Sequence, residues 1–371
     1  MRLQATYHLK TTGENVMDLA RAMAIELTVE VPESVIDRYR DTSKNLVARI
    51  ESVQEIGDRT HRLVLSFSEK LPGKDLTRWL NLLMGNCSMI PGVRLVDVEV
   101  PEEHLKSFRG PHHGIRGVRN IVGVMERPLV ATALKPRGAP GKDLQKICRE
   151  FVVGGGDVIK DDHNLIDDST TEFKQRVTAC VDTIRESQKG RHVLYLVNLM
   201  SPDETLEERL SIALEAGADG ALLAPWVLGL DRTRHLIDQY PGVYLGHPSM
   251  SGILTSQGEG GFSLPVVHGL FARLAGLDGS VFVNAGGRFN TTREEGRQIA
   301  EKLRSPMGHV EPGWAIPAGG MTPDRISEML EDYGSDSMIL MGGALLAAEQ
   351  GVTALTREIV VSLQEKFSAV D

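Results

Sequence analysis

The chain alternates between short apolar runs and longer stretches in which apolar residues recur with a helical period. Beyond residue 110 the short apolar runs favour buried strands, as at the β-branched Val158 and Ile159, and the periodic stretches favour helices that separate most of them. Eight such runs are expected to form strands: residues 129–134, 158–160, 193–198, 220–224, 243–247, 281–284, 315–318 and 338–341. This repeated order of strand and helix predicts an α/β fold, a (β/α)8 TIM barrel.

An open, doubly wound parallel sheet is the rival interpretation. Eight units without the glycine fingerprint of a dinucleotide-binding site favour the barrel. Ahead of it, expected strands at residues 3–9, 47–56 and 61–66 and helices at 13–25 and 75–83 predict a smaller α+β domain of the ferredoxin-like kind. The turn-forming residues 108–115 are interpreted as a linker, so the predicted domains are residues 1–110 and 111–371.

Composition narrows the class of protein. With 371 residues, 41% of them hydrophobic, the chain can bury a large core. A formal net charge of −9 and the lack of a basic run argue against nucleic acid as a partner. Three cysteines are too few for a disulfide framework, and no run of about 18 apolar residues is present to cross a bilayer. A cytoplasmic protein without a membrane partner is therefore expected.

The expected strand at residues 158–160 ends in the charged sequence Lys160, Asp161, Asp162, His163. Strand alternation places Lys160 and Asp162 on one side and Asp161 on the other, with His163 just beyond. Carboxylates with an imidazole suit a Mg²⁺ site, so this charged stretch is a candidate metal site. The alternative is a solvated loop whose aspartates cap the next helix.

Other expected strands also end in polar residues or glycines, which the barrel would gather at one rim. Lys135 and Arg137 follow the first strand, and His247 ends the fifth. Gly286, Gly287 and Arg288 follow the sixth strand, Gly319 and Gly320 the seventh, and Gly342 and Gly343 the eighth. The last two glycine pairs lie where barrels often bind a phosphate, although each pair alone is also compatible with a tight turn.

Several of these motifs resemble the large subunit of ribulose bisphosphate carboxylase (RuBisCO). The motifs are FRGPHHG at 108–114, LKPR at 134–137 and GGGDVIKDD at 154–162. The spacing of His247 and of the late glycine pairs is also similar, so the resemblance covers nearly the whole chain.

The resemblance implies roles for the residues that match the motifs. Lys160 would be carbamylated by CO₂ and would hold Mg²⁺ with Asp162, while His163 stands in place of the family's glutamate. Lys135 matches a proton-shuttling lysine and His247 an active-site histidine. Glu26 and Asn86 match residues contributed across a dimer interface, which implies a homodimer or an assembly of dimers. Gly319, Gly320, Gly342 and Gly343 match phosphate-binding glycines.

Departures from the family pattern argue against CO₂ fixation. Arg137 replaces a second lysine, Pro248 a phosphate-binding arginine, Ser251 a second histidine, Arg288 the mobile-loop lysine and Ala318 a serine. Arg137 and Arg288 are therefore candidate substrate contacts. The pattern is similar to that of RuBisCO-like proteins (form IV), whose members perform enolate chemistry on other phosphorylated sugars.

The expected function is Mg²⁺-dependent enolate chemistry on a phosphorylated sugar in carbohydrate catabolism. Decarboxylation or carboxyl transfer of a 3-oxo sugar-acid phosphate is favoured, because His163 changes the metal site and Arg288 could hold a carboxylate of the substrate. One alternative is an isomerase or enolase of a phosphoketose, such as a methionine-salvage intermediate of the 5-methylthioribulose 1-phosphate type. Another is a non-catalytic binding or regulatory barrel, against which the retention of Lys135, Lys160 and Asp162 argues.

Overall fold

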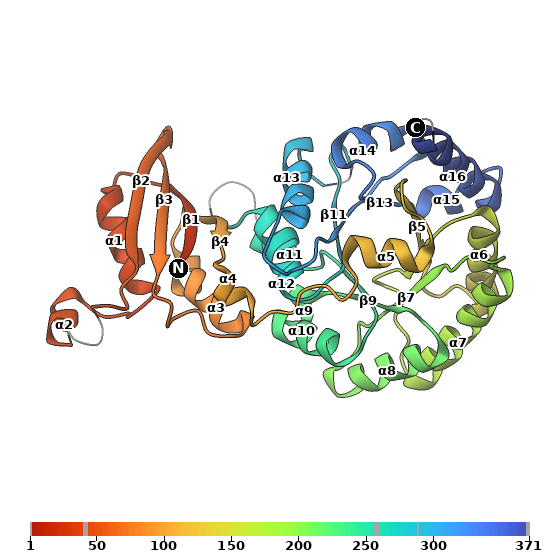
Figure 1. Ribbon diagram of the computed structural model, residues 1–371, viewed down its shortest axis with the longest axis horizontal. Coiled ribbons are helices and arrows are strands. Elements are labelled where there is room, and N and C mark those ends of the chain that lie inside the picture. The colour runs from red at the N-terminus through yellow and green to blue at the C-terminus, as the bar shows by residue number, and fades with distance from the viewer. Residues whose placement is uncertain (1, 40–43, 256–259, 288, 369–371) are drawn as a thin grey trace.

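A small antiparallel sheet forms the N-terminal part of the computed structural model, which describes residues 2–39, 44–255, 260–287 and 289–368. In Figure 1 this part lies to one side of the barrel. Its first four strands lie in the order β4-β1-β3-β2, the ferredoxin-like arrangement that was predicted. The elements are β1 (Leu3–Lys10), α1 (Val16–Glu26), α2 (Glu33–Arg38), β2 (Arg49–Gly57), β3 (Thr60–Phe67), α3 (Leu76–Leu83), η1 (Gly85–Met89), β4 (Val93–Glu99) and α4 (Glu102–Leu105).

Eight parallel strands form the barrel, and each corresponds to a predicted strand. They are β5 (Leu129–Leu134), β6 (Val158–Asp161), β7 (Leu194–Asn198), β8 (Gly220–Leu223), β9 (Val243–Gly246), β11 (Gly279–Val283), β12 (Trp314–Ala318) and β13 (Met338–Leu340). A bridge between Ala315 and Ser337 joins β12 to the start of β13. The strands therefore form a nearly closed ring, so the predicted TIM barrel is confirmed and the open sheet is excluded.

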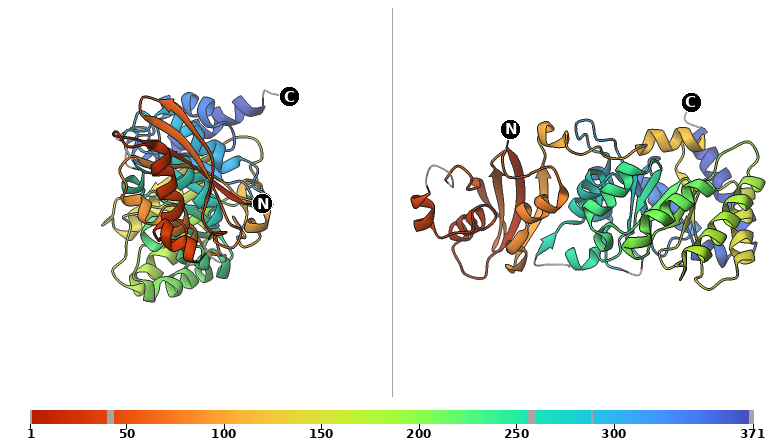
Figure 2. Two further views of the ribbon diagram at one scale, coloured as in Figure 1. Left: turned by 90° about the vertical axis from the view of Figure 1, so that its left-hand side faces the viewer. Right: turned by 90° about the horizontal axis from the view of Figure 1, so that it is seen from below.

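Helices surround the barrel (Figure 1), and the right-hand view of Figure 2 shows the N-terminal sheet beside it. The longer ones are α6 (Gly141–Gly154), α7 (Thr170–Ser187), α8 (Asp203–Ala216), α10 (Leu230–Gln239), α13 (Arg293–Arg304), α14 (Ile326–Tyr333) and α16 (Val352–Ser368). The shorter elements are α9 (Pro225–Leu228), α11 (Ser251–Leu254), β10 (Gly261–Phe262), η2 (Val266–Leu270), α12 (Phe271–Leu274), η3 (Pro323–Arg325) and α15 (Gly343–Leu346). None of the helices in the described ranges is long and apolar enough to cross a membrane.

One helix, α5 (Gly114–Val122), begins inside the segment that was interpreted as a linker. Ile115, Val118 and Val122 on this helix pack into a cluster with inward-facing strand residues such as Leu129 and Val158. Figure 1 shows α5 in front of the centre of the barrel. Because Leu129 and Val158 begin their strands, α5 closes the amino end of the barrel and leaves the carboxyl end for the site.

A strand pairing and a hydrophobic cluster connect the N-terminal sheet to the barrel. The short strand β10, which comes from the barrel sequence, pairs in parallel with β4 through Gly261 and Phe262. Phe262 and Phe271 belong to the same buried cluster as Leu95. Neither β4 nor β10 was predicted, and the division at residues 110 and 111 stays a prediction.

Candidate functional site

The charged stretch at the end of β6 divides its side chains as strand alternation predicted. Asp161 is fully buried, and its side chain points away from the barrel interior towards the surrounding helices. It accepts hydrogen bonds from Arg176, Tyr195 and the backbone N–H of Asn198. Asp161 is therefore a structural residue. Helix α7 is capped by Ser169 instead, so the alternative in which the aspartates cap this helix is wrong.

Asp162 is the centre of a charged cluster in the cavity. Its two carboxylate oxygens lie 2.8 Å from Lys135 Nζ and 2.9 Å from His163 Nδ1. Burial acts to raise the pKa of Asp162, but the hydrogen bonds from His163 and Lys135 outweigh it and hold the pKa far below its usual range. Asp162 is therefore ionised at every pH at which the protein would be used.

Lys160 is buried beside this cluster. Its Nζ donates a hydrogen bond to the backbone oxygen of Asp161 at 3.0 Å. Burial lowers the pKa of Lys160 to about 8, because the charged ammonium loses its hydration, and the charge of Asp162 only partly opposes this. The lowered pKa increases the neutral fraction of the amine relative to an ordinary lysine, and a neutral amine is what carbamylation by CO₂ requires.

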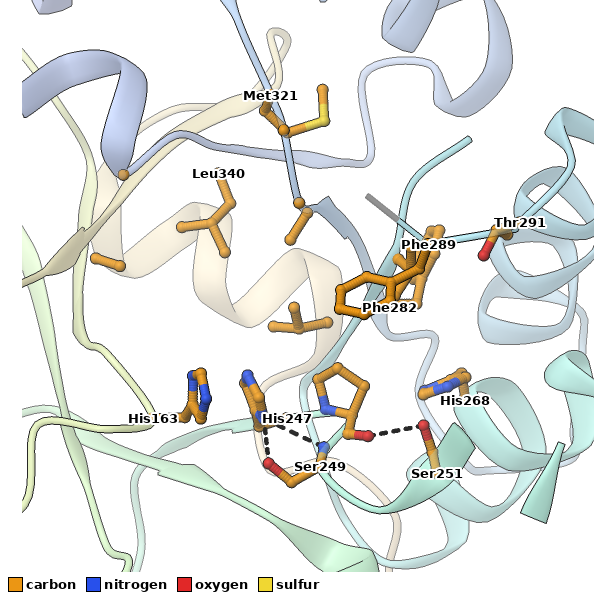
Figure 3. Close-up of a pocket in the computed structure, with 18 of the residues that line it drawn as sticks. His163, His247, Ser249, Ser251, His268, Phe282, Phe289, Thr291, Met321 and Leu340 are labelled. Atoms are coloured by element: carbon orange, nitrogen blue, oxygen red, sulfur yellow. Dashed lines mark hydrogen bonds between the residues drawn. The ribbon is translucent and has the colours of Figure 1, made fainter. Parts of the chain in front are cut away.

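His247, which follows β9, stacks on His163 with ring centroids 4.3 Å apart and planes inclined by 19°. Burial, helped by the charge of Lys160, lowers the pKa of His247 to about 3. The backbone N–H of Ser249 lies 3.2 Å from His247 Nδ1, so Nδ1 accepts this hydrogen bond and the ring proton is on Nε2 (Figure 3). His247 is therefore neutral, and its Nε2–H is a potential donor.

These residues line one side of a cavity of about 1020 Å³ at the carboxyl ends of the strands. The lining also has an apolar part, here called the apolar wall, which consists of the side chains of Leu264, Val281, Phe282, Phe289, Ile299, Met321 and Leu340. Figure 3 labels four of them, Phe282, Phe289, Met321 and Leu340. In the described part of the lining the basic groups are lysines and histidines, without an arginine. The cavity therefore offers a charged wall for chemistry and an apolar wall for a nonpolar part of a ligand.

The late glycines also line this cavity. Gly319 and Gly320 have φ values of 93° and 71°, which side chains rarely adopt, and no atom lies within 4 Å of a Cβ placed on Gly319. A Cβ on Gly342 would lie 2.8 Å from Lys135 Cε. Gly342 therefore makes room for Lys135, a role that the sequence did not indicate, and the open backbone at Gly319 and Gly343 leaves space for an anion.

Four predicted site residues are not part of the described cavity. Arg137 is exposed and lies 3.5 Å from the carboxylate of Asp168. Asn86 donates a hydrogen bond to Glu26 at 2.9 Å, and both belong to the N-terminal part. Arg288 lies outside the described residues.

His268 lines the cavity but was not predicted. It lies on the π-helical turn η2, and burial lowers its pKa to about 4. Its Nδ1 lies 3.4 Å from Ser280 Oγ. Its sequence neighbours are apolar residues and glycine, so no local motif marks it; π-helical turns are frequent at functional sites, but such a turn is visible only in the structure.

Asp162, His163 and Lys160 fit a metal ion only if Lys160 is carbamylated. Nowhere in the described ranges do three or more carboxylate, imidazole or thiol groups gather as a ready metal site. Asp162 and His163 are two suitable donors, and the hydrogen bond from His163 Nδ1 leaves Nε2 available for a metal. A carbamate on Lys160 would add the missing oxygen ligands, so the donor set fits Mg²⁺ when Lys160 is modified.

Comparison with known proteins identifies a consistent set of relatives. Residues 114–368 match the family described as "Ribulose bisphosphate carboxylase large chain, catalytic domain". The chain is 33% identical over 366 residues to a 5-methylthioribulose-1-phosphate isomerase of Rhodospirillum rubrum, covering 98% of this chain and 96% of the relative. It is 29% identical to a 2,3-diketo-5-methylthiopentyl-1-phosphate enolase of Bacillus licheniformis, covering 92% and 87%. A crystal structure of a Rubisco-like protein from Rhodopseudomonas palustris is 31% identical, with a TM-score of 0.88 and 98% of each chain covered.

Proposed function

This chain belongs to the ribulose bisphosphate carboxylase large-chain family as a RuBisCO-like protein, and from this premise we propose that it isomerises or enolises a phosphorylated ketose of the 5-methylthioribulose 1-phosphate type. The observation that carries the proposal is the contact of Lys135 with Asp162 at the charged wall of a cavity that also has an apolar wall. This wall offers a proton acceptor, and the apolar wall suits a thioether substituent. The named activities of the relatives support the same class of reaction.

The reaction requires a proton to leave a carbon next to a carbonyl group. In the proposed mechanism the amine of Lys135 removes this proton, and the bonding electrons pass into an enediolate. Asp162 is ionised and 2.8 Å away, so it stabilises the ammonium that Lys135 becomes. Return of the proton to the neighbouring carbon, with transfer of a proton between the two substrate oxygens, completes an isomerisation. The Nε2–H of His247 is a candidate donor to one of these oxygens.

The remaining groups would bind the substrate and the cofactor. Asp162, His163 and carbamylated Lys160 would hold Mg²⁺, which supplies a Lewis acid for the carbonyl oxygen when it is bound. The open backbone at Gly319 and Gly343 would accept the phosphate group. One phosphate is then bound at the glycines, and the apolar wall takes the other end of the substrate.

Decarboxylation of a 3-oxo sugar-acid phosphate was the favoured expectation from the sequence. The named activities of the relatives are isomerisation and enolisation, which agree better with the alternative. The argument for a substrate carboxylate depended on Arg288, which lies outside the described residues. The decarboxylase reading therefore stays a prediction without support of its own.

The proposal is tested with 5-methylthioribulose 1-phosphate in D₂O containing Mg²⁺ and bicarbonate. Incorporation of deuterium from solvent into a carbon next to the carbonyl, or conversion to an isomer, is expected by NMR. A 3-oxo sugar-acid phosphate assayed in parallel should release no CO₂. If the ketose is unchanged and undeuterated while CO₂ is released, the decarboxylase reading replaces this one.

We expect no carboxylation of ribulose 1,5-bisphosphate. A second phosphate on the same substrate would need a second strong anion site inside the catalytic cavity, and Pro248 and Ser251 line this cavity where the carboxylases resembled by this sequence have basic residues. The measurement is incorporation of ¹⁴CO₂ into acid-stable product at saturating Mg²⁺. Labelled phosphoglycerate above the background of a Lys160→Ala variant would contradict the expectation.

The homodimer prediction is tested by complementation. Asn86→Ala and Lys160→Ala should each inactivate the enzyme if Glu26 and Asn86 complete the site of a partner subunit. Coexpressed in equal amounts, the variants should recover about a quarter of wild-type activity, because half the dimers are mixed and each mixed dimer has one intact site. Recovery is not expected if each chain completes its own site, and a fully active monomer in sedimentation would also refute the prediction.

A further inference from the structure

A second cleft, of about 360 Å³, lies between the N-terminal sheet and the barrel. The sheet contributes His8, Lys10 and Arg94, and the barrel contributes Ser263, Glu295 and Gln298 among others. Leu264 and Glu295 line both this cleft and the catalytic cavity, so the two adjoin. Apart from Leu264 of the apolar wall, the described residues that line this second cleft have no task in the proposed mechanism.

Three basic residues form one row across the sheet; His8 and Arg94 line this cleft, and Arg62 continues the row on the neighbouring strand. His8 on β1 is directly opposite Arg62 on β3 and directly opposite Arg94 on β4. Directly opposite residues in neighbouring strands project from the same face with Cβ atoms about 4.5–5.5 Å apart, and like charges in such positions are destabilising. The adjacent residues Tyr7 and Leu63 are buried in the hydrophobic cluster, so alternation turns the basic row, Arg62, His8 and Arg94, to the other face.

One acid, Glu295, lines the cleft with the basic row, but within the described residues it forms no ion pair with His8 or Arg94. Across the described ranges, no ion pair or side-chain hydrogen bond is formed by Arg62, His8 or Arg94. Glu295, the acid in the cleft, already accepts hydrogen bonds from Thr292, and Asp97 on β4 pairs with Lys302. Burial, and then the charges of Arg94 and Arg62, lower the pKa of His8, as expected where positive potential is not neutralised.

We propose that the basic row is a second anion site, which binds phosphate or the phosphate group of a small phosphomonoester. Two guanidinium groups flanking an imidazole can donate several charge-assisted hydrogen bonds to a tetrahedral dianion. The cleft volume is that of a site for a small molecule. An anion there would remove the repulsion along the row, and this gives the protein a thermodynamic reason to bind one.

The test compares Arg62→Gln/Arg94→Gln with a control that removes the same charge elsewhere, Arg116→Gln/Arg149→Gln. Both control residues are exposed on barrel helices. Thermal unfolding and calorimetry are measured with inorganic phosphate at constant ionic strength. Phosphate bound in the catalytic cavity contributes equally to all the proteins and does not affect the comparison.

Without phosphate, the row variant should unfold at the same temperature as the control or at a higher one, because repulsion has been removed. With phosphate, the unfolding temperature of the wild type and the control should rise more than that of the row variant. Phosphate affinity of the second site should fall on the order of tenfold to hundredfold, as for loss of hydrogen bonds to a charged group. Arg94→Lys, which keeps the charge, should retain most of the response.

Equal phosphate responses in the row variant and the control would overturn the proposal. So would a row variant that changes sedimentation but not phosphate binding, because the row would then be a contact between subunits. If the double variant does not fold, Arg94→Gln alone is compared with Arg149→Gln by the same two measurements. If the row variant loses phosphate binding at the second site but turns over the ketose at the wild-type rate, the second site is shown to be independent of the proposed catalytic function.

Discussion

Lys135→Met is expected to reduce deuterium exchange into the ketose by about 10²- to 10⁴-fold, the usual effect of losing a positioned acid or base. Lys135 Nζ lies at the charged wall of the cavity, 2.8 Å from Asp162, and Gly342 leaves the space that its side chain occupies. Methionine has a similar length and fills this space without a group that can carry a proton. Binding of the phosphoketose and of Mg²⁺ should change little, because neither depends on the amine in the proposed arrangement.

The measurements are solvent exchange by NMR and ligand binding by calorimetry. Lys142→Met, at an exposed position on α6, is the matched control and should behave as the wild type. Exchange at the wild-type rate in Lys135→Met would show that Lys135 is not the base. His268 and Glu295, which also line the cavity, would then be the next candidates to test.

Lys160→Ala is expected to abolish high-affinity Mg²⁺ binding. The described residues provide only Asp162 and His163 as unmodified ligands beside Lys160, so the carbamate supplies the oxygen atoms that Mg²⁺ needs. Removal of a residue that only supports a metal ligand typically lowers metal affinity by about 10- to 100-fold. The loss of Mg²⁺ affinity in Lys160→Ala should be larger than this. In the wild type, Mg²⁺ affinity should also increase with added bicarbonate, and this dependence should vanish in the variant.

Calorimetry with and without bicarbonate makes this comparison, and mass spectrometry after trapping the carbamate identifies the modified lysine. Lys174→Ala, on the exposed side of α7, is the control. If Lys160→Ala binds Mg²⁺ as tightly as the wild type, the end of β6 is not the metal site. The proposed mechanism would then lose its Lewis acid but not its base.

The sequence predicted the barrel and the orientation of the residues at the end of β6, because both depend on local periodicity. Alternation alone was enough to separate Lys160 and Asp162 from Asp161. Helix α5 was missed because its start, at Gly114, lies among turn-forming residues and has a φ of 56°. Its helical character depends on apolar contacts with the end of the barrel.

Other features depend on contacts between distant parts of the chain. Strand β10 has two residues, and its partner on β4 is more than 160 positions away, so no local pattern predicts it. His268 reaches the cavity through a π-helical turn among apolar residues, which conceals it in the sequence. The cross-strand row of Arg62, His8 and Arg94 likewise appears only when the register of three strands is known.

The pairing of β10 with β4 links the folding of the two parts of the chain. A fragment that ends near residue 110 would keep β4 but lose Phe262 and Phe271, which cover part of its hydrophobic cluster. The uncovered edge of β4 would then present unpaired backbone groups beside exposed apolar side chains, a combination that favours aggregation. The small sheet is therefore not a module that can be transferred between proteins, and a chimera that exchanges it must also exchange the barrel segment that includes β10.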